Sequence, residues 1–246
     1  MKKVFHTMAL LSLSITLLSA QDDYKMFLTM LLEPKLDQIS AFEENLATHN
    51  KKFHNEGFMS ADVWSIFSGS NAGKYAWVMG PLTFSDFDSR ERDQAHDDDW
   101  NNNVLALCKH VTDFEWVKLR EDLSYTPEGS ESGKELYSVY DVKKGQWYRF
   151  EKVLKMAMEV YKAKDYPDYF RVYYSRFQSN THRDVAISNG LRTWASLDEK
   201  STFRKDFEEV HGEGSSDNFL KEYRESYNSY EDELSVYLPH LSGTAK

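Results

Sequence analysis

The order of the predicted secondary-structure elements occurs twice along this chain, and that repetition constrains the fold more strongly than any local motif. From residue 24 to residue 125, the hydrophobic pattern predicts a strand, a helix, two strands, a second helix and a last strand. The same order returns between residues 135 and 241. The segment 126–134 is small, polar and free of large apolar residues, as a linker is. We therefore expect two α+β units, residues 21–125 and residues 135–246.

The strands are predicted from short runs of apolar and aromatic side chains that turn residues separate. In the first unit these runs cover residues 24–32, 58–67, 74–79 and 114–119. In the second unit they cover residues 136–142, 169–177, 185–194 and 234–238. The two middle runs of each unit are close enough along the chain to pair as a hairpin.

The helices are predicted from apolar side chains three or four positions apart, which place one apolar stripe on each helix. In the first unit the stripes run through residues 36–53 and 100–111, and in the second unit through residues 150–161 and 203–230. Cys108 is the only cysteine and falls within the second of these stripes, so we expect a buried thiol on a helix. A single cysteine excludes an intramolecular disulfide.

A unit of the order β-α-β-β-α-β is the ferredoxin-like arrangement, whose helices cover one face of the sheet. The other face must also be covered where it is apolar. Both faces of the first strand are apolar here, because Met26 and Leu28 alternate with Phe27 and Leu31. We therefore expect the two units to pack sheet to sheet within one chain and to form an intramolecular α/β barrel.

Two landmarks accompany this order of elements. Each unit has a Trp at the end of its third predicted strand, Trp77 and Trp194, and a His on the helical segment that follows, His96 and His211. Together with the topology, this pattern resembles the dimeric α/β-barrel superfamily, which includes the antibiotic-biosynthesis-monooxygenase-like and NIPSNAP-like proteins. The resemblance covers nearly all of the chain after residue 20, and it implies a tandem repeat of two ferredoxin-like units.

The resemblance implies a protein that binds or processes a small molecule in a pocket between sheet and helices. The implied chemistry is cofactor-free oxygenation or isomerisation of an aromatic or polyketide-like compound. His96 and His211 would then transfer protons, and Trp77 and Trp194 would shape the pocket. Some families of the superfamily hold haem, so a haem-binding protein is an alternative. A non-catalytic interaction protein is a third alternative, in which the aromatic residues serve packing or partner contact.

Tyrosines are concentrated in the second unit, where twelve of the fifteen follow the linker. If Tyr137, Tyr169 and Tyr173 face the barrel interior, they line an amphipathic cavity, because tyrosine combines a large ring with a polar tip. Arg171 shares a strand face with Tyr169 and Tyr173, and it would need an anionic partner if it were buried. The alternative is that the tyrosines form the edge of the core and that Arg171 is solvated.

No strong catalytic or metal-binding motif accompanies these residues. The chain contains no Gly-rich phosphate-binding loop, no G-x-S-x-G elbow and no H-E-x-x-H pair. The histidines are scattered singly, whereas a zinc site needs several convergent ligands, so no metal site is expected. The three aspartates at residues 97–99 precede an apolar stripe and suit a helix N-terminus or a solvated face better than a calcium site.

Residues 1–20 have the pattern of an export signal, because Lys2 and Lys3 precede an apolar run that ends near Ala20. We expect cleavage before Gln21 and a periplasmic or extracellular protein with no membrane anchor. Cleavage changes the formal net charge from −10 to −12. An acidic chain without a basic stripe argues against nucleic acid and anionic membranes as partners. The expected partner is a small molecule, and the expected assembly is a monomeric pseudo-dimer or a homo-oligomer.

Overall fold

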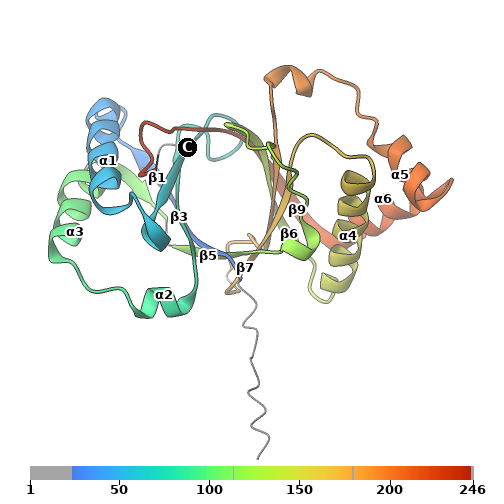
Figure 1. Cartoon of the computed structure of the whole chain (residues 1–246), viewed down its shortest axis with the longest axis horizontal. Helices are drawn as coiled ribbons and strands as arrows, with labels where there is room; N and C mark the ends of the chain where they lie inside the picture. The colour runs from blue at the N-terminus through green and yellow to red at the C-terminus, as the bar shows by residue number, and fades with distance from the viewer. Residues whose placement is uncertain (1–23, 113, 179, 245–246) are drawn as a thin grey trace, which may run out of the picture.

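A closed antiparallel barrel of eight strands lies at the centre of the computed structural model, which describes residues 24–112, 114–178 and 180–244. Around the barrel the strands follow the order β3-β2-β9-β6-β8-β7-β5-β1, and β1 pairs with β3 to close the ring. Figure 1 shows the ring with helices on two opposite sides. The expected α+β barrel is therefore confirmed.

The described chain contains both strands and helices. The barrel strands are β1 (Met26–Pro34), β2 (Ala61–Ile66), β3 (Tyr75–Leu82), β5 (Glu115–Leu119), β6 (Lys134–Val142), β7 (Phe170–Ser175), β8 (Val185–Gly190) and β9 (Tyr227–Tyr237). The short strand β4 (Cys108–Val111) pairs with the end of β1 outside the ring. The helices are α1 (Ile39–Phe53), α2 (Phe84–Asp88), α3 (Gln94–Asp99), α4 (Trp147–Ala163), α5 (Phe203–His211) and α6 (Ser215–Ser226).

Each half of the chain contributes four neighbouring strands in the same spatial order. The first half gives β5-β1-β3-β2, and the second half gives β9-β6-β8-β7. Two antiparallel seams join the halves: Trp64 lies opposite Tyr237 between β2 and β9, and Val117 lies opposite Ser175 between β5 and β7. These seams cover sheet edges that each half would otherwise expose.

Helices cover the outer face of each half-sheet, and an apolar core fills each of the two layers. In the first half, α1 buries Phe42 and Leu46 against the sheet. In the second half, α4 buries Phe150 and Leu154. The inner faces of the two half-sheets are turned towards each other across the barrel, as Figure 1 shows. Each strand therefore has one face in a helix layer and one face in the barrel.

The C-terminal segment returns from the second half to the first, and its end lies near β3 and α1 in Figure 1. Leu241 is buried in the core of the first half, and its carbonyl accepts a hydrogen bond from Nδ2 of Asn50 at 2.7 Å. Gly243 lies against His54, where a Cβ atom would come within 1.7 Å of the His54 carbonyl oxygen. Only glycine fits this close approach. The chain end thus ties the strand β9 to the helix layer of the opposite half.

The predicted helix over residues 100–111 is wrong in its second part. The chain passes through a π-helical turn at Trp100–Val104 and a 3₁₀ turn at Leu105–Leu107, and then enters β4. Cys108 therefore begins a strand, and its side chain is half-buried rather than part of the core. Pairing with β1 decides the conformation here, because tertiary context overrides a short helical periodicity. Burial raises the pKa of the Cys108 thiol to about 11, which keeps it protonated at neutral pH.

The predicted helix over residues 203–230 also ends early. Residues from Tyr227 onward belong to β9, where Tyr227 lies opposite Val142 and Tyr230 lies opposite Tyr140 of β6. Aromatic residues three positions apart fit a helical stripe, but they also fit a strand, and cross-strand ring contacts stabilise the strand. The Tyr140 and Tyr230 rings stack at 5.3 Å.

Two further predicted positions differ from the structure. Leu36 was expected on the apolar stripe of the first helix, but the helix α1 begins at Ile39 and Leu36 is 90% exposed. Trp194 was expected on the strand that pairs with residues 169–177. The strand β8 ends at Gly190, and Trp194 opens a 3₁₀ turn.

Residues 1–23 lie outside the described part of the chain, so the export signal at residues 1–20 stays a prediction. Among the helices of the described residues, none has both the length and the apolar character needed to cross a membrane. Between the bridge that pairs Tyr125 with Phe170 and the start of β6, residues 126–133 form neither helix nor strand.

We expect Phe150→Ala to lower the free energy of unfolding by about 3–5 kcal/mol, because the ring is fully buried beneath α4 and its removal leaves a cavity. Urea denaturation followed by circular dichroism measures this change. Tyr148→Ala on the same helix is the control, because Tyr148 is 68% exposed and should change the stability by less than about 0.5 kcal/mol. Equal midpoints for the Phe150 variant and the unaltered protein would contradict the placement of this core.

Candidate functional site

The barrel contains an open cavity of about 1760 Å³, lined by strands of both halves. Its walls come from strand positions that face away from the helices, because successive side chains of a strand point to opposite faces. On β3, Ala76 and Val78 face the cavity, whereas Trp77 packs in the helix layer. The volume exceeds the roughly 300–1,000 Å³ of ordinary small-molecule pockets. The pocket therefore lies between the two sheets, and the expectation of a pocket between sheet and helices was wrong.

A carboxyl group on β6 faces this cavity. Glu135 Oε2 accepts hydrogen bonds from Ser188 Oγ and, at 3.3 Å, from the Tyr169 hydroxyl, and Glu135 Oε1 accepts from Ser235 Oγ at 2.9 Å. Burial raises the pKa of Glu135 above its ordinary value, and the hydrogen bonds from these hydroxyls oppose the rise. The carboxyl thus holds its proton to a higher pH than an exposed glutamate, and it can exchange a proton with a molecule in the cavity.

Arg171 on β7 lies on the same wall. Its Nη2 donates to Glu131 Oε1 at 2.9 Å, and its guanidinium lies 4.1 Å from the centre of the Tyr169 ring. Arg171 is half-buried, and its anionic partner Glu131 is exposed. The positive charge of Arg171 also opposes the rise in the pKa of Glu135. The stacked ring and the ion pair hold the guanidinium in one orientation at the cavity wall.

Further charged groups line other parts of the cavity. Arg183 Nε lies 3.0 Å from Glu115 Oε1, so this cation is also paired. Glu233 is 3% exposed and accepts a hydrogen bond from Asn71 Nδ2 at 2.5 Å. Burial raises the pKa of Glu233 too, which makes it the second interior carboxyl of this kind beside Glu135. The interior is therefore polar and hydrogen-bonded, as well as aromatic.

Four of the residues selected from the sequence line this cavity: Tyr137, Tyr169, Arg171 and Tyr173. The three tyrosines therefore face the barrel interior, as the amphipathic-cavity hypothesis required. Burial raises the pKa of Tyr173 to about 12, and it raises the pKa values of Tyr137 and Tyr169 further. All three hydroxyls therefore stay protonated at neutral pH and can donate hydrogen bonds inward.

The two tryptophans and His211 lie outside the cavity wall. Trp77 Nε1 donates to Asn50 Oδ1 at 3.0 Å in the helix layer of the first half. Trp194 packs edge-on against the Phe67 ring at 5.0 Å. His211 ends α5, and its Nε2 lies 3.1 Å from the carbonyl oxygen of Met156. None of them faces the cavity, so the matched positions of the two halves do not form one site.

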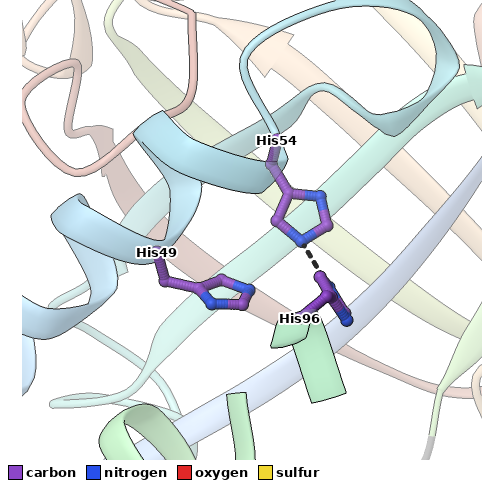
Figure 2. A group of neighbouring side chains, drawn as sticks. All are labelled: His49, His54 and His96. Atoms are coloured by element: carbon purple, nitrogen blue, oxygen red, sulfur yellow. Dashed lines mark hydrogen bonds between the residues drawn. The ribbon is translucent and has the colours of Figure 1, made fainter. Parts of the chain in front are cut away.

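His96 occupies a different environment. It lies on α3, where that helix packs against the end of α1. It lies beside His49 and His54, and Figure 2 shows the three imidazoles turned towards a common centre. One ring nitrogen from each residue can be chosen so that all three lie within 4.8 Å of one another. His49 and His54 are 0% and 1% exposed, and His96 is 9% exposed. No metal site was expected from the sequence, but the fold brings together three histidines whose spacing along the chain matches no metal-binding motif.

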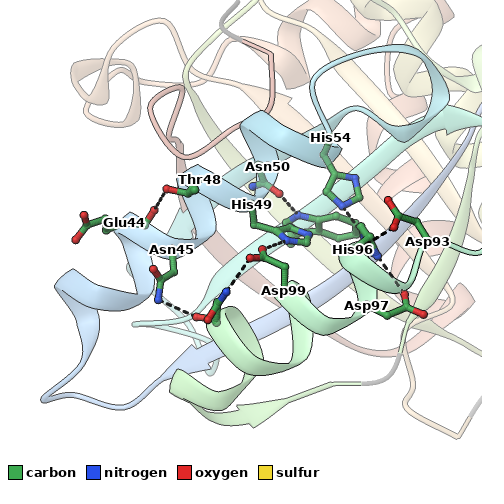
Figure 3. Close-up of polar contacts among 12 residues, drawn as sticks. Glu44, Asn45, Thr48, His49, Asn50, His54, Asp93, His96, Asp97 and Asp99 are labelled. Atoms are coloured by element: carbon green, nitrogen blue, oxygen red, sulfur yellow. Dashed lines mark hydrogen bonds and ion pairs between the residues drawn. The ribbon is translucent and has the colours of Figure 1, made fainter.

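The other nitrogen of each ring has an acceptor, as Figure 3 shows for the carboxylate partners. His49 Nδ1 lies 2.7 Å from Asp99 Oδ2, and His96 Nδ1 lies 3.2 Å from Asp97 Oδ1. His54 Nδ1 lies 2.7 Å from the Met59 carbonyl oxygen. A carbonyl can only accept, so His54 carries its proton on Nδ1, and its Nε2 is an acceptor that lies 3.1 Å from His96 Nε2. Burial lowers the pKa of His54 to about 3, and so the ring is neutral.

Within the part of the chain that the structure describes, the cavity wall carries no buried histidine that could ligate haem. Among the described residues that line the cavity, the histidines are His110 and His182, both of which are exposed. His182 Nδ1 is also paired with Asp141 at 3.1 Å. The buried histidines lie instead in the packed helix layer of the first half. These residues do not fit haem ligation through a buried histidine, and haem stays a prediction of the resemblance alone.

Sequence reasoning missed Glu135, which is the central polar group of the cavity, and it missed His49 and His54. Glu135 stands two positions before Tyr137 on one strand, so both face the same side, and this alternation was the available signal. His49 and His54 are five positions apart and His96 follows 42 positions later. That spacing matches no metal-binding motif. The three histidines meet only because α3 packs on α1.

No protein-family model matches the sequence, and no curated protein matches it. Solved structures match the fold. A proposed monooxygenase from Lactobacillus acidophilus NCFM superposes with a TM-score of 0.53 at 10% identity, over 87% of this chain and 94% of that chain. An anthrone oxidase-like protein gives 0.57 at 10% identity, over 89% and 92% of the two chains.

A chlorite dismutase from Candidatus Nitrospira defluvii, solved in complex with imidazole, gives a TM-score of 0.54 at 11% identity, over 89% of this chain and 93% of that chain. Each of these similarities extends over most of both chains, so it concerns the whole barrel. They show the ferredoxin-like dimeric α/β-barrel fold that the sequence suggested. At such identities they show the fold alone.

We expect Glu135→Gln to stabilise the protein more at high pH than at low pH. The folded-state pKa of Glu135 lies above the unfolded value of about 4.5, so the folded protein binds more protons between these two values. The free energy of unfolding of the unaltered protein therefore falls as the pH rises through that window. The variant has no carboxyl at this position and shows no such fall. Thermal unfolding of both proteins from pH 4 to pH 8 measures the difference.

Glu128→Gln is the matched control, because Glu128 is exposed in the segment before β6 and its replacement removes the same charge. This variant should track the unaltered protein across the pH range. A difference between the Glu135 variant and the unaltered protein that does not change with pH would show that Glu135 titrates like a solvated carboxyl.

Proposed function

We propose that this protein binds a small, oxygen-bearing aromatic molecule inside the barrel and exchanges a proton with it through Glu135. The observation that carries this proposal is the Glu135 carboxyl, which faces a large cavity and is held by three hydroxyl groups. A carboxyl held in place by hydrogen bonds and shifted by burial is typical of acid–base sites. Proton transfer of this kind serves cofactor-free oxygenation or isomerisation.

The cavity walls favour a ligand with both rings and hydroxyl or carbonyl oxygens. The rings of Phe27 and Tyr173 meet edge to face at 5.9 Å, and both residues line the cavity, which gives an aromatic surface for stacking. The hydroxyls of Tyr137 and Tyr173 offer donors, and Arg171 adds a cation that Glu131 already neutralises. The neighbouring structures supply independent support for the ligand class, since one of them is an anthrone oxidase-like protein.

Two further parts of the proposal concern assembly and repetition. The ring of strands is complete within one chain, so a cavity of this kind does not require a second copy. This supports a monomeric pseudo-dimer. The two halves have the same order of elements and the same spatial order of strands, which supports the proposal that they are tandem copies of one ferredoxin-like unit.

We expect anthrone, added as a test ligand, to quench the fluorescence of Trp64, which lines the cavity. Glu135→Gln should weaken the binding about tenfold, because one hydrogen bond to a charged or proton-sharing group contributes roughly 1.5 kcal/mol. Titration of tryptophan fluorescence, repeated by calorimetry, gives both affinities. The chain has other tryptophans, so Trp64→Phe identifies the part of the signal that comes from the cavity.

Tyr148→Phe is the control, because this tyrosine is exposed on α4 and far from the barrel interior. It should bind anthrone like the unaltered protein. If the Glu135 variant binds anthrone with the same affinity as the unaltered protein, the ligand does not bind at the proposed site. Failure to bind anthrone or its hydroxylated derivatives would reject the ligand class.

We also expect the mature protein to begin at Gln21, if residues 1–20 act as an export signal in the cell that makes it. The support is the charged start and the apolar run of this segment. Mass spectrometry of the intact protein, isolated from the periplasm or the medium, gives the first residue. A chain that retains Met1 and remains in the cytoplasm would reject export.

A further inference from the structure

We propose that His49, His54 and His96 form a binding site for one divalent transition-metal ion of the zinc class. The site joins the end of α1, which carries His49 and is followed by His54, to α3, which carries His96. It lies in the helix layer of the first half and is separate from the barrel cavity, whose lining includes none of the three residues.

The three imidazoles already have the spacing of a nearly closed metal site. His54 Nε2 and His96 Nε2 are 3.1 Å apart. Two nitrogens that each bind a tetrahedral zinc ion at 2.0–2.1 Å are about 3.3 Å apart. The cluster as a whole spans no more than 4.8 Å between its chosen nitrogens, so small rotations of the rings bring the third ligand into place.

The hydrogen-bond partners around the rings are compatible with the tautomer that a metal ion needs. Each Nδ1 faces an oxygen, and a ligating histidine usually donates its second N–H to a carboxylate or a carbonyl in this way. His54 Nε2 therefore presents a lone pair towards His96 Nε2. His96 Nδ1 lies closer to the Asp97 carboxylate, at 3.2 Å, than to the Arg90 guanidinium, at 3.5 Å. With the Nδ1 proton on both rings, two lone pairs meet at 3.1 Å, and a cation between them removes the repulsion.

His49 provides the second and independent observation. Its side chain is 0% exposed, and its Nε2 has no hydrogen-bond partner. A buried polar atom without a partner is rare and costs about 1–3 kcal/mol. Its Nδ1 is committed to Asp99, which leaves Nε2 as an acceptor for something that the chain itself does not supply. The same ring lies 5.2 Å from His54 and 5.0 Å from His96, measured between centroids.

The donor set indicates the class of metal. Three imidazoles suit zinc, copper, nickel or cobalt, whereas magnesium and calcium require oxygen ligands. Three protein ligands leave a fourth position for water in a tetrahedral site. The carboxylates of Asp97 and Asp99 stand behind two of the ligands and balance the charge of the ion. The exposed edge of His96 provides the entry path.

Aromatic rings enclose the remaining sides. Phe53 lies edge-on to His96 at 5.2 Å, Trp100 lies 4.9 Å from His49, and Trp77 lies edge-on to His54 at 5.0 Å. These rings pack directly around the three imidazoles. The site therefore acts as a clamp that holds the short helix α3, only six residues long, against α1.

The test uses the full chain without an affinity tag, because tag histidines would bind the same ions. After dialysis against a chelator, we expect one equivalent of Zn²⁺ to bind in calorimetry and to raise the melting temperature. Co²⁺ should bind at the same place and give the visible absorption of a tetrahedral complex. Mg²⁺ and Ca²⁺ should leave the melting temperature unchanged.

His96→Gln should lower the affinity for Zn²⁺ by about 100-fold or more and abolish the Co²⁺ absorption. His211→Gln is the matched control, because His211 also ends a helix but lies in the other half, and it should bind both ions like the unaltered protein. Circular dichroism without metal shows whether the His96 variant is folded. If it is not, Asp99→Asn serves instead, because this change keeps all three ligands and should weaken Zn²⁺ binding at least tenfold.

Three outcomes would overturn the proposal. The first is a chain that binds neither Zn²⁺ nor Co²⁺ at micromolar concentration. The second is equal Zn²⁺ affinity in the His96 variant, or in the Asp99 variant where that one is used, which would place the ion elsewhere. The third is stabilisation by Ca²⁺ in place of Zn²⁺, which would point to the aspartates alone.

Discussion

The two antiparallel seams between β2 and β9 and between β5 and β7 are the constraint on which the rest of the structure depends. Each half-sheet alone has an apolar outer face for its helices and an inner face that water would reach. Pairing at both seams closes the ring, satisfies the backbone groups along the joined edges and turns the inner faces towards each other. A closed ring of eight strands has room for side chains and one small ligand. The cavity is therefore a direct consequence of edge pairing.

Closure supplies partners for some of the charged groups inside. Asn71 of the first half donates to Glu233 of the second half, and Glu115 of the first half pairs with Arg183 of the second half. Glu135 and Arg171 instead find their partners within the second half. Burial without partners would cost far more than the strands could offset. The hydroxyls of Ser188 and Ser235 come from two strands that flank β6, so the carboxyl of Glu135 is held only when the second half-sheet is assembled.

Much of this fold could be predicted from the sequence, because the strand and helix periodicities around Phe42 and Phe150 reflect burial on one face. The errors occurred where a short pattern fits two structures. The positions of Tyr227 and Tyr230 fit a helix as long as their pairing with β6 is unknown. The position of Cys108 fits a helix as long as its pairing with β1 is unknown. The site was harder, because convergence is a property of packing. Tyr173 could be assigned to the correct strand face, but nothing in the sequence brings His96 to His54.

The strand β3 separates the cavity from the histidine cluster. Ala76 and Val78 face the cavity, and between them Trp77 contacts the His54 ring at 5.0 Å. An influence of one site on the other must therefore pass through a displacement of β3. That strand is paired on both sides, with β1 and with β2, and a shift would break ladder hydrogen bonds on each side. Coupling carried by a packed element requires that the element have two discrete arrangements, and pairing on both sides disfavours a second arrangement of β3. The metal site and the ligand cavity should therefore act independently, although a single wall divides them.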